Sequence, residues 1–363
     1  MNQILYLFIA CIIYQAVYQL ILIIAIAKKK KTDLKSQISN LKSVSIVICA
    51  KNETENLQQN LPFILNQNYP DFEVIVVDDG SDERLTMNNE RLTIINLNKE
   101  EKIGLGKKYA LRKGVEAAKN ELILLTDADC QPASANWITE MANCVTDEKK
   151  IVLGISPYKT ESTLLNALIE YETSQTMLQY LGFAILGNPY MSVGRNVLYD
   201  RNLWLSKKWT NEELSIASGD DDLAVQTLAN EKNTTVCLSL DGYTYSEAKK
   251  TWSAYFKQKI RHYESGKLYK TSHKLILSFY HVTKTMIYLL FILTIVSISQ
   301  TYSIYLWYVI AYLVITYMTN MFVHITLKTQ KRWSYNPILD SIYCFTLLFI
   351  GSMSLFTRNP KWK

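Results

Sequence analysis

The sequence has little glycine, proline or histidine, and its few cysteines form no paired motif. Among 363 residues there are 12 glycines, 7 prolines, 6 cysteines and 4 histidines. So little glycine and proline excludes a collagen-like or low-complexity chain. Hydrophobic residues make up 48% of the chain, which is too much for a disordered protein. Six cysteines without a CxxC pair are too few for a disulfide scaffold, and the histidines lack zinc-ligand spacing. We therefore expect reduced thiols and a catalytic part that faces the cytoplasm.

Charge is missing from a long stretch near the N-terminus. Residues 4–27 contain no charged side chain, and the four lysines of 28–31 follow directly. A bilayer core needs about 20 apolar residues per helix. A signal peptide would carry its basic residues before a shorter apolar run, so this order predicts a retained membrane helix with a cytoplasmic C-terminal end. A buried helix of a soluble protein is the weaker alternative, because such a helix rarely lacks a charged face over so many turns.

Three more apolar runs lie in the last third of the chain. They cover residues 277–299, interrupted by Lys284 near the start, 302–327 and 338–356. The connection Gln300-Thr301 is uncharged, as an outside loop should be, and the connection 328–336 carries basic residues, as an inside loop should. Four spans would put both termini outside, which the basic tail (Arg358, Lys361, Lys363) fits poorly. Either the tail lies outside despite the preference of basic residues for the cytoplasmic side, or the last segment is re-entrant and the tail stays inside.

Between the membrane segments, short apolar strands alternate with helical patterns. The predicted strands are 44–49, 73–77, 92–97 and 122–126, and helical spacing lies between them at 56–66 and 107–118. The strands are apolar on both faces, as in a parallel sheet that helices cover. This alternation predicts an open α/β sheet, whose ligands bind at the carboxyl ends of the strands.

Polar and mostly acidic residues follow these strands. The first strand ends in Ala50-Lys51-Asn52-Glu53, the second in Asp78-Asp79-Gly80-Ser81 and the fourth in Asp127-Ala128-Asp129, and Gly104-Leu105-Gly106-Lys107 opens a helix after the third. Carboxylates that converge on one edge repel each other, and a divalent cation or a basic substrate would relieve this repulsion. An isolated Asp-x-Asp is more often a solvated turn. Because this one directly follows an all-apolar strand, we interpret it as a site for Mg²⁺ or Mn²⁺.

Two further patterns lie toward the end of this middle region. Gly219-Asp220-Asp221-Asp222 opens a helical pattern at 223–229, where the helix dipole favours a carboxylate by about 0.3–1 kcal/mol. Asp220 or Asp221 could be only a helix cap, or one of them could be a general base that the dipole keeps ionised. Residues 252–263 predict an amphipathic helix with Gln258, Arg261 and His262 at its polar end. The alternative for that helix is packing on the membrane, with its basic residues at lipid headgroups.

Taken in order, these motifs resemble those of the family 2 glycosyltransferases, above all relatives with flanking membrane helices and a Gln-x-x-Arg-Trp motif. The resemblance covers about residues 43–265 and implies a GT-A fold that binds a nucleotide-diphospho-sugar, with a uridine base favoured. For the donor, it implies Ala50, Glu53 and Asp79 at base and ribose, Lys107 and Asp127 near the nucleotide, and Gln258 and Arg261 over the diphosphate. For the chemistry, it implies Asp129, with Asp127, as metal ligands and Asp221 as the base that deprotonates the acceptor, with Asp220 the other candidate.

The chain departs from the family pattern at two positions. Arg112 stands where many relatives have asparagine, and His262 replaces the tryptophan that relatives stack near the acceptor sugar. The three consecutive aspartates leave the register of the base ambiguous by one residue. Gly194-Arg195-Asn196 resembles the acceptor-side loop of the family.

These observations predict a fold and a division into domains. The fold class is α/β: a GT-A, mostly parallel sheet flanked by helices, with one N-terminal and about three C-terminal transmembrane helices. We expect a transmembrane helix in 1–32, a cytoplasmic catalytic domain in 33–270 and a transmembrane region in 271–363. Within the catalytic domain, residues 43–160 form the nucleotide-binding half and 161–270 the acceptor half.

The function predicted on this basis is that of an inverting glycosyltransferase in a bacterial inner membrane. It would use a divalent cation, Mg²⁺ or Mn²⁺, to move a sugar from a UDP-sugar to a lipid or cell-envelope glycan acceptor. Its partners would be the donor, the acceptor and membrane lipids, with no nucleic acid. A processive synthase of a β-linked polysaccharide is the first alternative.

Two alternatives come from other classes. A nucleotidyltransferase would carry a glycine-rich loop with an arginine after its first strand, where this chain has Ala50-Lys51-Asn52-Glu53. An inactive membrane scaffold is disfavoured, because every expected acidic position is filled.

Overall fold

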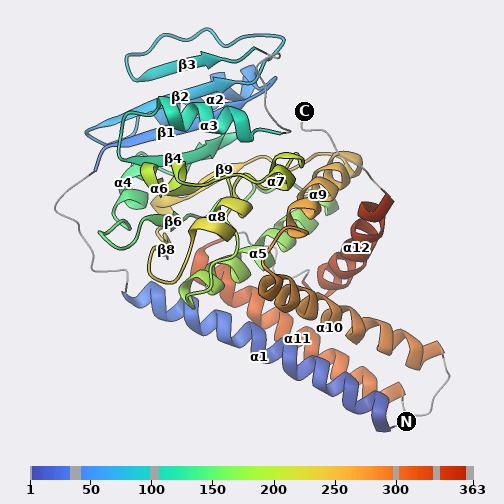
Figure 1. Ribbon diagram of the computed structural model, residues 1–363. Helices are drawn as coiled ribbons and strands as arrows, with labels where there is room; N and C mark the ends of the chain where they lie inside the picture. The colour runs from blue at the N-terminus through green and yellow to red at the C-terminus, as the bar shows by residue number, and fades with distance from the viewer. Residues whose placement is uncertain (1, 33–41, 99–105, 297–301, 330–335, 357–363) are drawn as a thin grey trace.

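The computed structural model describes residues 2–32, 42–98, 106–296, 302–329 and 336–356 (Figure 1). The basic tail at Arg358, Lys361 and Lys363, the connection Gln300-Thr301 and Gly104-Leu105 of the glycine motif lie outside these residues. The predicted α/β sheet is present, with seven strands in the order β3-β2-β1-β4-β7-β6-β8.

The four predicted strands form the parallel half of the sheet. They are β1 (Val44–Ala50), β2 (Phe72–Asp78), β3 (Leu92–Asn96) and β4 (Leu122–Asp127). β1 is buried over its whole length, because α2 (Thr54–Leu65) lies in one core layer and α3 (Lys108–Ala117) in the other. The chain fills β1, β2 and β3 in one direction and places β4 on the other side of β1. The carboxyl ends of β1 and β4 therefore flank the point where the strand order reverses, which is where open α/β sheets bind ligands.

The other half of the sheet consists of short strands that the sequence pattern did not predict. They are β6 (Ile151–Leu153), β7 (Val197–Asp200) and β8 (Thr234–Val236). β7 is antiparallel to β4 and β6, whereas β6 and β8 are parallel, so the sheet is mostly parallel as predicted. The antiparallel pair β5 (Cys130–Pro132) and β9 (Thr244–Ser246) lies outside this sheet. The short helices around it are α4 (Trp137–Ala142), α6 (Arg201–Leu205), α7 (Asn211–Leu214), α8 (Asp222–Leu228) and the 3₁₀ turn Leu240–Gly242.

A long helix, α5 (Leu164–Ile185), lies between the sheet and the apolar helices (Figure 1). The apolar helices α1 (Asn2–Thr32), α10 (Thr271–Val296) and α11 (Tyr302–Leu327) pack against one another. Each is long and apolar enough to cross a membrane, over residues 3–31, 271–295 and 303–327. Three of the four predicted apolar runs thus form helices of spanning length.

The fourth run forms α12 (Asn336–Phe356), whose apolar part, residues 338–354, is shorter than a span. Its N-terminal part contacts α10 and α11, and its C-terminal part packs on α9 (Trp252–Gly266) (Figure 1). The rings of Phe349 in α12 and Phe256 in α9 have centroids 5.2 Å apart. The C-terminal part of α12 thus contacts the domain that contains the sheet.

Candidate active site

A pocket of about 470 Å³ opens at the carboxyl ends of β1 and β4. Residues that follow these strands line one side, and the starts of α3 and α8 line another. The polar end of α9 and one face of α5 complete the wall. Eight of the ten predicted site residues line this pocket: Glu53, Lys107, Asp127, Asp129, Asp220, Asp221, Gln258 and Arg261.

The remaining two predicted residues, Ala50 and Asp79, are buried at neighbouring strand ends. The Asp79 backbone N–H donates to the Ala50 carbonyl at 2.8 Å. The two residues are 2% and 5% exposed, and Ala50 directly follows Cys49, which lines the pocket. The structure therefore gathers the predicted set at one edge of the sheet, with Ala50 and Asp79 behind the pocket wall.

Lys107 joins two acidic motifs that are distant in the sequence. Its Nζ lies 2.8 Å from Asp127 Oδ1 and 3.1 Å from Asp220 Oδ2. Burial alone would lower the pKa of Lys107, but the charges of Asp127 and Asp220 outweigh it and raise that pKa well above its ordinary value. Lys107 thus stays protonated and holds the two carboxylates together.

Gly106 allows this close approach. Its φ of +74° lies in the left-handed region, which favours glycine. A Cβ at this position would lie 2.2 Å from the carbonyl oxygen of Ala217. Glycine before Lys107 therefore lets the chain that precedes Asp220 pass directly against the start of α3.

The two carboxylates of the Asp-x-Asp motif differ in their surroundings. Burial favours the neutral form of Asp127, but the nearby charge of Lys107 prevails and lowers its pKa. Burial, and next the charge of Asp127, raise the pKa of Asp129. A cation bound beside Asp129 would relieve both effects, so the donor set fits a metal that carboxylate oxygens bind.

Asp127 and Asp129 are the two carboxylates that we consider as metal ligands. In the parts of the chain that the structure describes, no three His, Cys, Asp or Glu side chains are grouped so as to hold an ion. Mg²⁺ and Mn²⁺ are commonly held by one or two carboxylates together with substrate phosphates and water. Asp127 and Asp129 match that kind of site, in which the substrate completes the coordination.

Asp221 caps helix α8 and faces the pocket. Its Oδ1 accepts from the Asp222 N–H at 2.9 Å, and its Oδ2 accepts from the Gly194 N–H at 2.6 Å. Burial and the neighbouring charge of Asp220 raise the pKa of Asp221 to about 6. Asp221 is therefore the N-cap of α8, and the pKa of its carboxyl group also suits a general base near neutral pH.

The next residue, Asp222, is tied to α9 and the chain after it. Its Oδ2 accepts from the Tyr269 hydroxyl at 2.7 Å and from Ser265 Oγ at 3.2 Å. Of the three consecutive aspartates, Asp220 pairs with Lys107 and Asp222 holds α9, and Asp221 keeps only backbone donors among the bonds described. Backbone N–H groups thus hold the Asp221 carboxylate, whereas side chains hold those of Asp220 and Asp222.

Basic side chains face the carboxylates across the pocket. Arg195 stacks on Tyr158, with its Cζ 4.1 Å from the ring centroid. Within the described residues, Nη1 of Arg195 and Nε of Arg261 are buried without a hydrogen-bond partner. Burial, followed by the charges of Lys259 and Arg261, lowers the pKa of His262 well below its ordinary value, so its imidazole is neutral. The pocket thus has an acidic edge and an edge with spare cationic donors.

The pocket also contains residues that the sequence did not assign to it. Glu172, Thr176 and Met177 of α5 form its side toward the apolar helices. Glu172 pairs with Lys259 of α9 at 2.8 Å. Glu172 is one of two acidic residues in α5, and no motif or spacing in the sequence connects it to α9.

The fold resembles that of a solved glycosyltransferase. The chain aligns with the mannosyltransferase PcManGT from Pyrobaculum calidifontis, solved in complex with GDP-Man and Mn²⁺, over 95% of its own length and 98% of that chain. The TM-score is 0.57 and the sequence identity is 14%, which supports likeness of fold. The protein is therefore an α/β protein of the GT-A-like class.

Sequence comparison finds a family model that matches part of the chain. Residues 45–204 match the family described as Glycosyl transferase family 2. The chain is 28% identical over 102 residues to poly-beta-1,6-N-acetyl-D-glucosamine synthase of Staphylococcus epidermidis, covering 26% of this chain and 24% of that protein. It is 24% identical over 253 residues to the probable glycosyltransferase YdaM of Bacillus subtilis, covering 62% and 56%. The chain thus spans about half or less of these two relatives, and it carries a glycosyltransferase family 2 domain.

Proposed function

We propose that this protein is an inverting, metal-dependent glycosyltransferase that moves a sugar from a nucleotide-diphospho-sugar, preferably a UDP-sugar, to a membrane-associated acceptor. The observation that carries the proposal is the single pocket that gathers Asp127, Asp129, Asp221 and Arg261 at the switch point of the sheet. Such a pocket offers carboxylates for a metal and a base, and a cation for a leaving diphosphate.

The donor would lie along the ends of β1, β2 and β4. We assign Ala50, Glu53 and Asp79 to the base and ribose, and Lys107 to the position near the nucleotide. Gln258 and Arg261 would donate hydrogen bonds to the diphosphate, because both line the pocket and the Arg261 Nε has no other partner among the described residues. These donors would stabilise the negative charge that develops as the sugar–phosphate bond breaks.

The transfer itself needs one base. Asp221 would take the proton of the acceptor hydroxyl while that oxygen forms a bond to the anomeric carbon. The bond from the anomeric carbon to the diphosphate oxygen breaks, and the electron pair leaves with the nucleoside diphosphate. One displacement inverts the anomeric carbon, so an α-linked donor gives a β-linked product.

We further propose that Asp129, with Asp127, holds a divalent cation. Bound there, Mg²⁺ or Mn²⁺ would supply Lewis-acid stabilisation of the diphosphate. Burial, followed by the like charge of Asp127, raises the pKa of Asp129, and a bound cation would relieve both effects, which supports this role. The Mn²⁺ in the complex of the mannosyltransferase PcManGT is consistent with it.

We propose that the acceptor is a lipid or a cell-envelope glycan at the membrane surface. The catalytic domain, residues 33–270, would face the cytoplasm of a bacterial cell between membrane segments 1–32 and 271–363, with the end of α12 on the same side. The support is that α5 lines the pocket on one face and contacts α1, α11 and α12 on the other, so the site lies close to the spanning helices.

The experiment is a screen of nucleotide sugars with the full chain purified in detergent. Release of nucleotide from one donor, dependent on Mg²⁺ or Mn²⁺, would support the proposal and identify the sugar. Turnover of none of the donors in the presence of membrane lipid extract would refute it.

A processive synthase is the second candidate, because one relative is named a poly-beta-1,6-N-acetyl-D-glucosamine synthase. The three helices of spanning length among the described residues are few for a pore wide enough for a polymer, which favours a single addition. The length of the product made from radiolabelled donor distinguishes the two: one added sugar excludes the synthase, and a ladder of products excludes the single transfer.

A further inference from the structure

Helix α5 has two polar faces that serve different parts of the molecule. Successive helical residues point about 100° apart, whereas residues four apart share a face. Tyr171 and Gln175 bond to residues of the apolar helices α10 to α12. Glu172 and Thr176 lie on the other face and line the pocket. α5 therefore separates the pocket from the membrane helices and contacts both.

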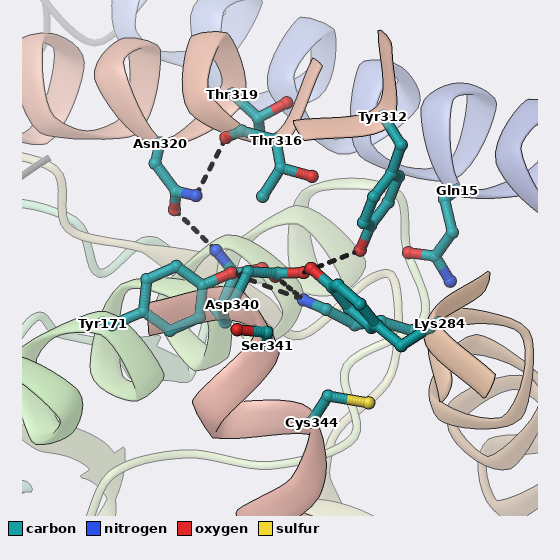
Figure 2. Close-up of polar contacts among 12 residues, drawn as sticks. Gln15, Tyr171, Lys284, Tyr312, Thr316, Thr319, Asn320, Asp340, Ser341 and Cys344 are labelled. Carbon is teal, nitrogen blue, oxygen red and sulfur yellow. Dashed lines mark hydrogen bonds and ion pairs between the residues drawn. The ribbon is translucent and has the colours of Figure 1, made fainter. Parts of the chain in front are cut away.

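The membrane-side face of α5 is bound to a buried ion pair. Lys284 Nζ of α10 lies 2.5 Å from Asp340 Oδ1 of α12, and the two residues are 1% and 0% exposed. The Tyr171 hydroxyl of α5 donates to the same Asp340 oxygen, and Lys284 also donates to that hydroxyl at 3.4 Å. Figure 2 shows Asp340 between Tyr171, Lys284 and Tyr312.

Further hydrogen bonds complete this cluster. The hydroxyls of Tyr288 and Tyr312 donate to Asp340 Oδ2 at 2.5 and 2.9 Å. One turn along α5, Gln175 Nε2 donates to Asn320 Oδ1 of α11 at 2.5 Å. The carboxylate is thus fully satisfied, and four helices, α5, α10, α11 and α12, meet at one polar centre.

The pocket-side face of α5 holds α9 in a similar way. Glu172 Oε1 pairs with Lys259 Nζ at 2.8 Å, and its Oε2 accepts from the Tyr255 hydroxyl at 3.0 Å. Lys259 lies between Gln258 and Arg261, the residues assigned to the diphosphate. The position of these two side chains over the pocket therefore depends on where α5 places Glu172.

A buried ion pair is a poor way to gain stability, because desolvation offsets most of its attraction and apolar residues of the same volume often do as well. Satisfied polar networks instead favour one geometry, since any displacement leaves a buried group unpaired. The polar centre around Asp340 fixes one face of α5 through Tyr171, and the next residue, Glu172, fixes α9 on the other face. This arrangement suits a role in positioning α9.

We propose that Asp340 and Lys284, through Tyr171, and Glu172, through Lys259, are positioning residues for the transfer reaction: they fix α5 between the membrane helices and α9 and so set the placement of Gln258 and Arg261 over the donor. This inference rests on the proposed function. None of these five side chains needs to touch the reacting atoms.

The test compares donor turnover in Tyr171→Phe, Asp340→Asn and Glu172→Gln, each close to isosteric with the native residue. The control is Ser341→Ala, next to Asp340, whose hydroxyl bonds at 2.8 Å only within its own helix, to the Ile338 carbonyl. In these three variants, we expect kcat to fall by about tenfold or more, because Gln258 and Arg261 no longer lie correctly over the diphosphate. The KM for the nucleotide sugar should change by less than about twofold. The double variant Tyr171→Phe/Glu172→Gln should be no slower than the slower single variant, because both act through α5.

Hydrogen exchange gives a readout that needs no turnover. Tyr171→Phe should speed exchange in α9, residues 252–266, although Tyr171 donates no bond to that helix, and should leave β1 and β4 unchanged. A merely structural cluster would lower the melting temperature while kcat per folded molecule and α9 exchange stay at wild-type values, and this result overturns the proposal. Should wild type turn over no donor, the proposed function fails, whereas the α9 exchange result still decides whether α5 couples the two ends.

Discussion

Replacing Lys107, the N-cap of α3, with methionine should destabilise the catalytic domain far more than replacing a lysine within that helix. Lys107→Met removes the cation that lies 2.8 Å from Asp127 and 3.1 Å from Asp220. Breaking a buried ion pair costs about 3–5 kcal/mol, because it leaves an uncompensated charge. Here the side chains of Asp127 and Asp220 are 32% and 9% exposed, so solvent screens part of the effect. We expect a loss of about 2–3 kcal/mol in the free energy of unfolding.

The assay is thermal unfolding of the full chain in detergent, with Lys113→Met as the matched control. Lys113 lies within α3, its side chain is 42% exposed, and it pairs with Glu116 at 3.4 Å. An exposed pair of this kind is worth about 0.3–0.5 kcal/mol. Lys107→Met should lower the melting temperature by roughly 4–12 °C, and Lys113→Met by no more than about 2 °C. Equal melting temperatures in the two variants would refute the bridging role of Lys107.

Three further predictions concern the pocket. Gly106→Ala, with its clash of 2.2 Å and φ of +74°, should unfold at a lower temperature than wild type, whereas Gly266→Ala, whose Cβ meets nothing within 4 Å, should not. Because the folded pKa of Asp221 is about 6, nucleotide release should fall as pH drops below that value; Asp221→Asn should cut turnover about 10²–10⁴-fold and abolish this acid limb. Asn196→Ala should cost about 2–4 kcal/mol of stability, seen as a lower denaturant midpoint, because it unpairs the buried Trp137 indole N–H and two carbonyls; an unchanged midpoint would exclude this.

The parallel half of the fold follows from local patterns. β1, β2, β3 and β4 were predicted within one residue of their ends, because each is a short run rich in Val, Ile and Leu that stands between turn residues and a helical pattern. β3 at the sheet edge differs from the expected burial on both faces, since Thr93 and Asn96 are exposed. The acidic residues after them lie together because the carboxyl ends of parallel strands meet at one edge. For the same reason, most of the predicted site residues line one pocket.

The remaining features depend on contacts between distant segments. β6 and β8 have only three residues each, too few for a periodic pattern; β6 acquires its register from β7, and β8 acquires its register from β6. Lys284 was visible as an interruption of an apolar run, but nothing in the sequence connects it with Asp340 in another helix. The pairing of Lys107 with Asp220 was hidden likewise, since it depends on the close passage at Gly106.

Metal-dependent nucleotide release from a screened nucleotide sugar tests the central claim most directly, measured for wild type, Asp129→Ala and the exposed control Asp147→Ala. We predict release by wild type and Asp147→Ala with Mg²⁺ or Mn²⁺, none with a chelator, and a loss in Asp129→Ala. Full metal-dependent release by Asp129→Ala would contradict the account.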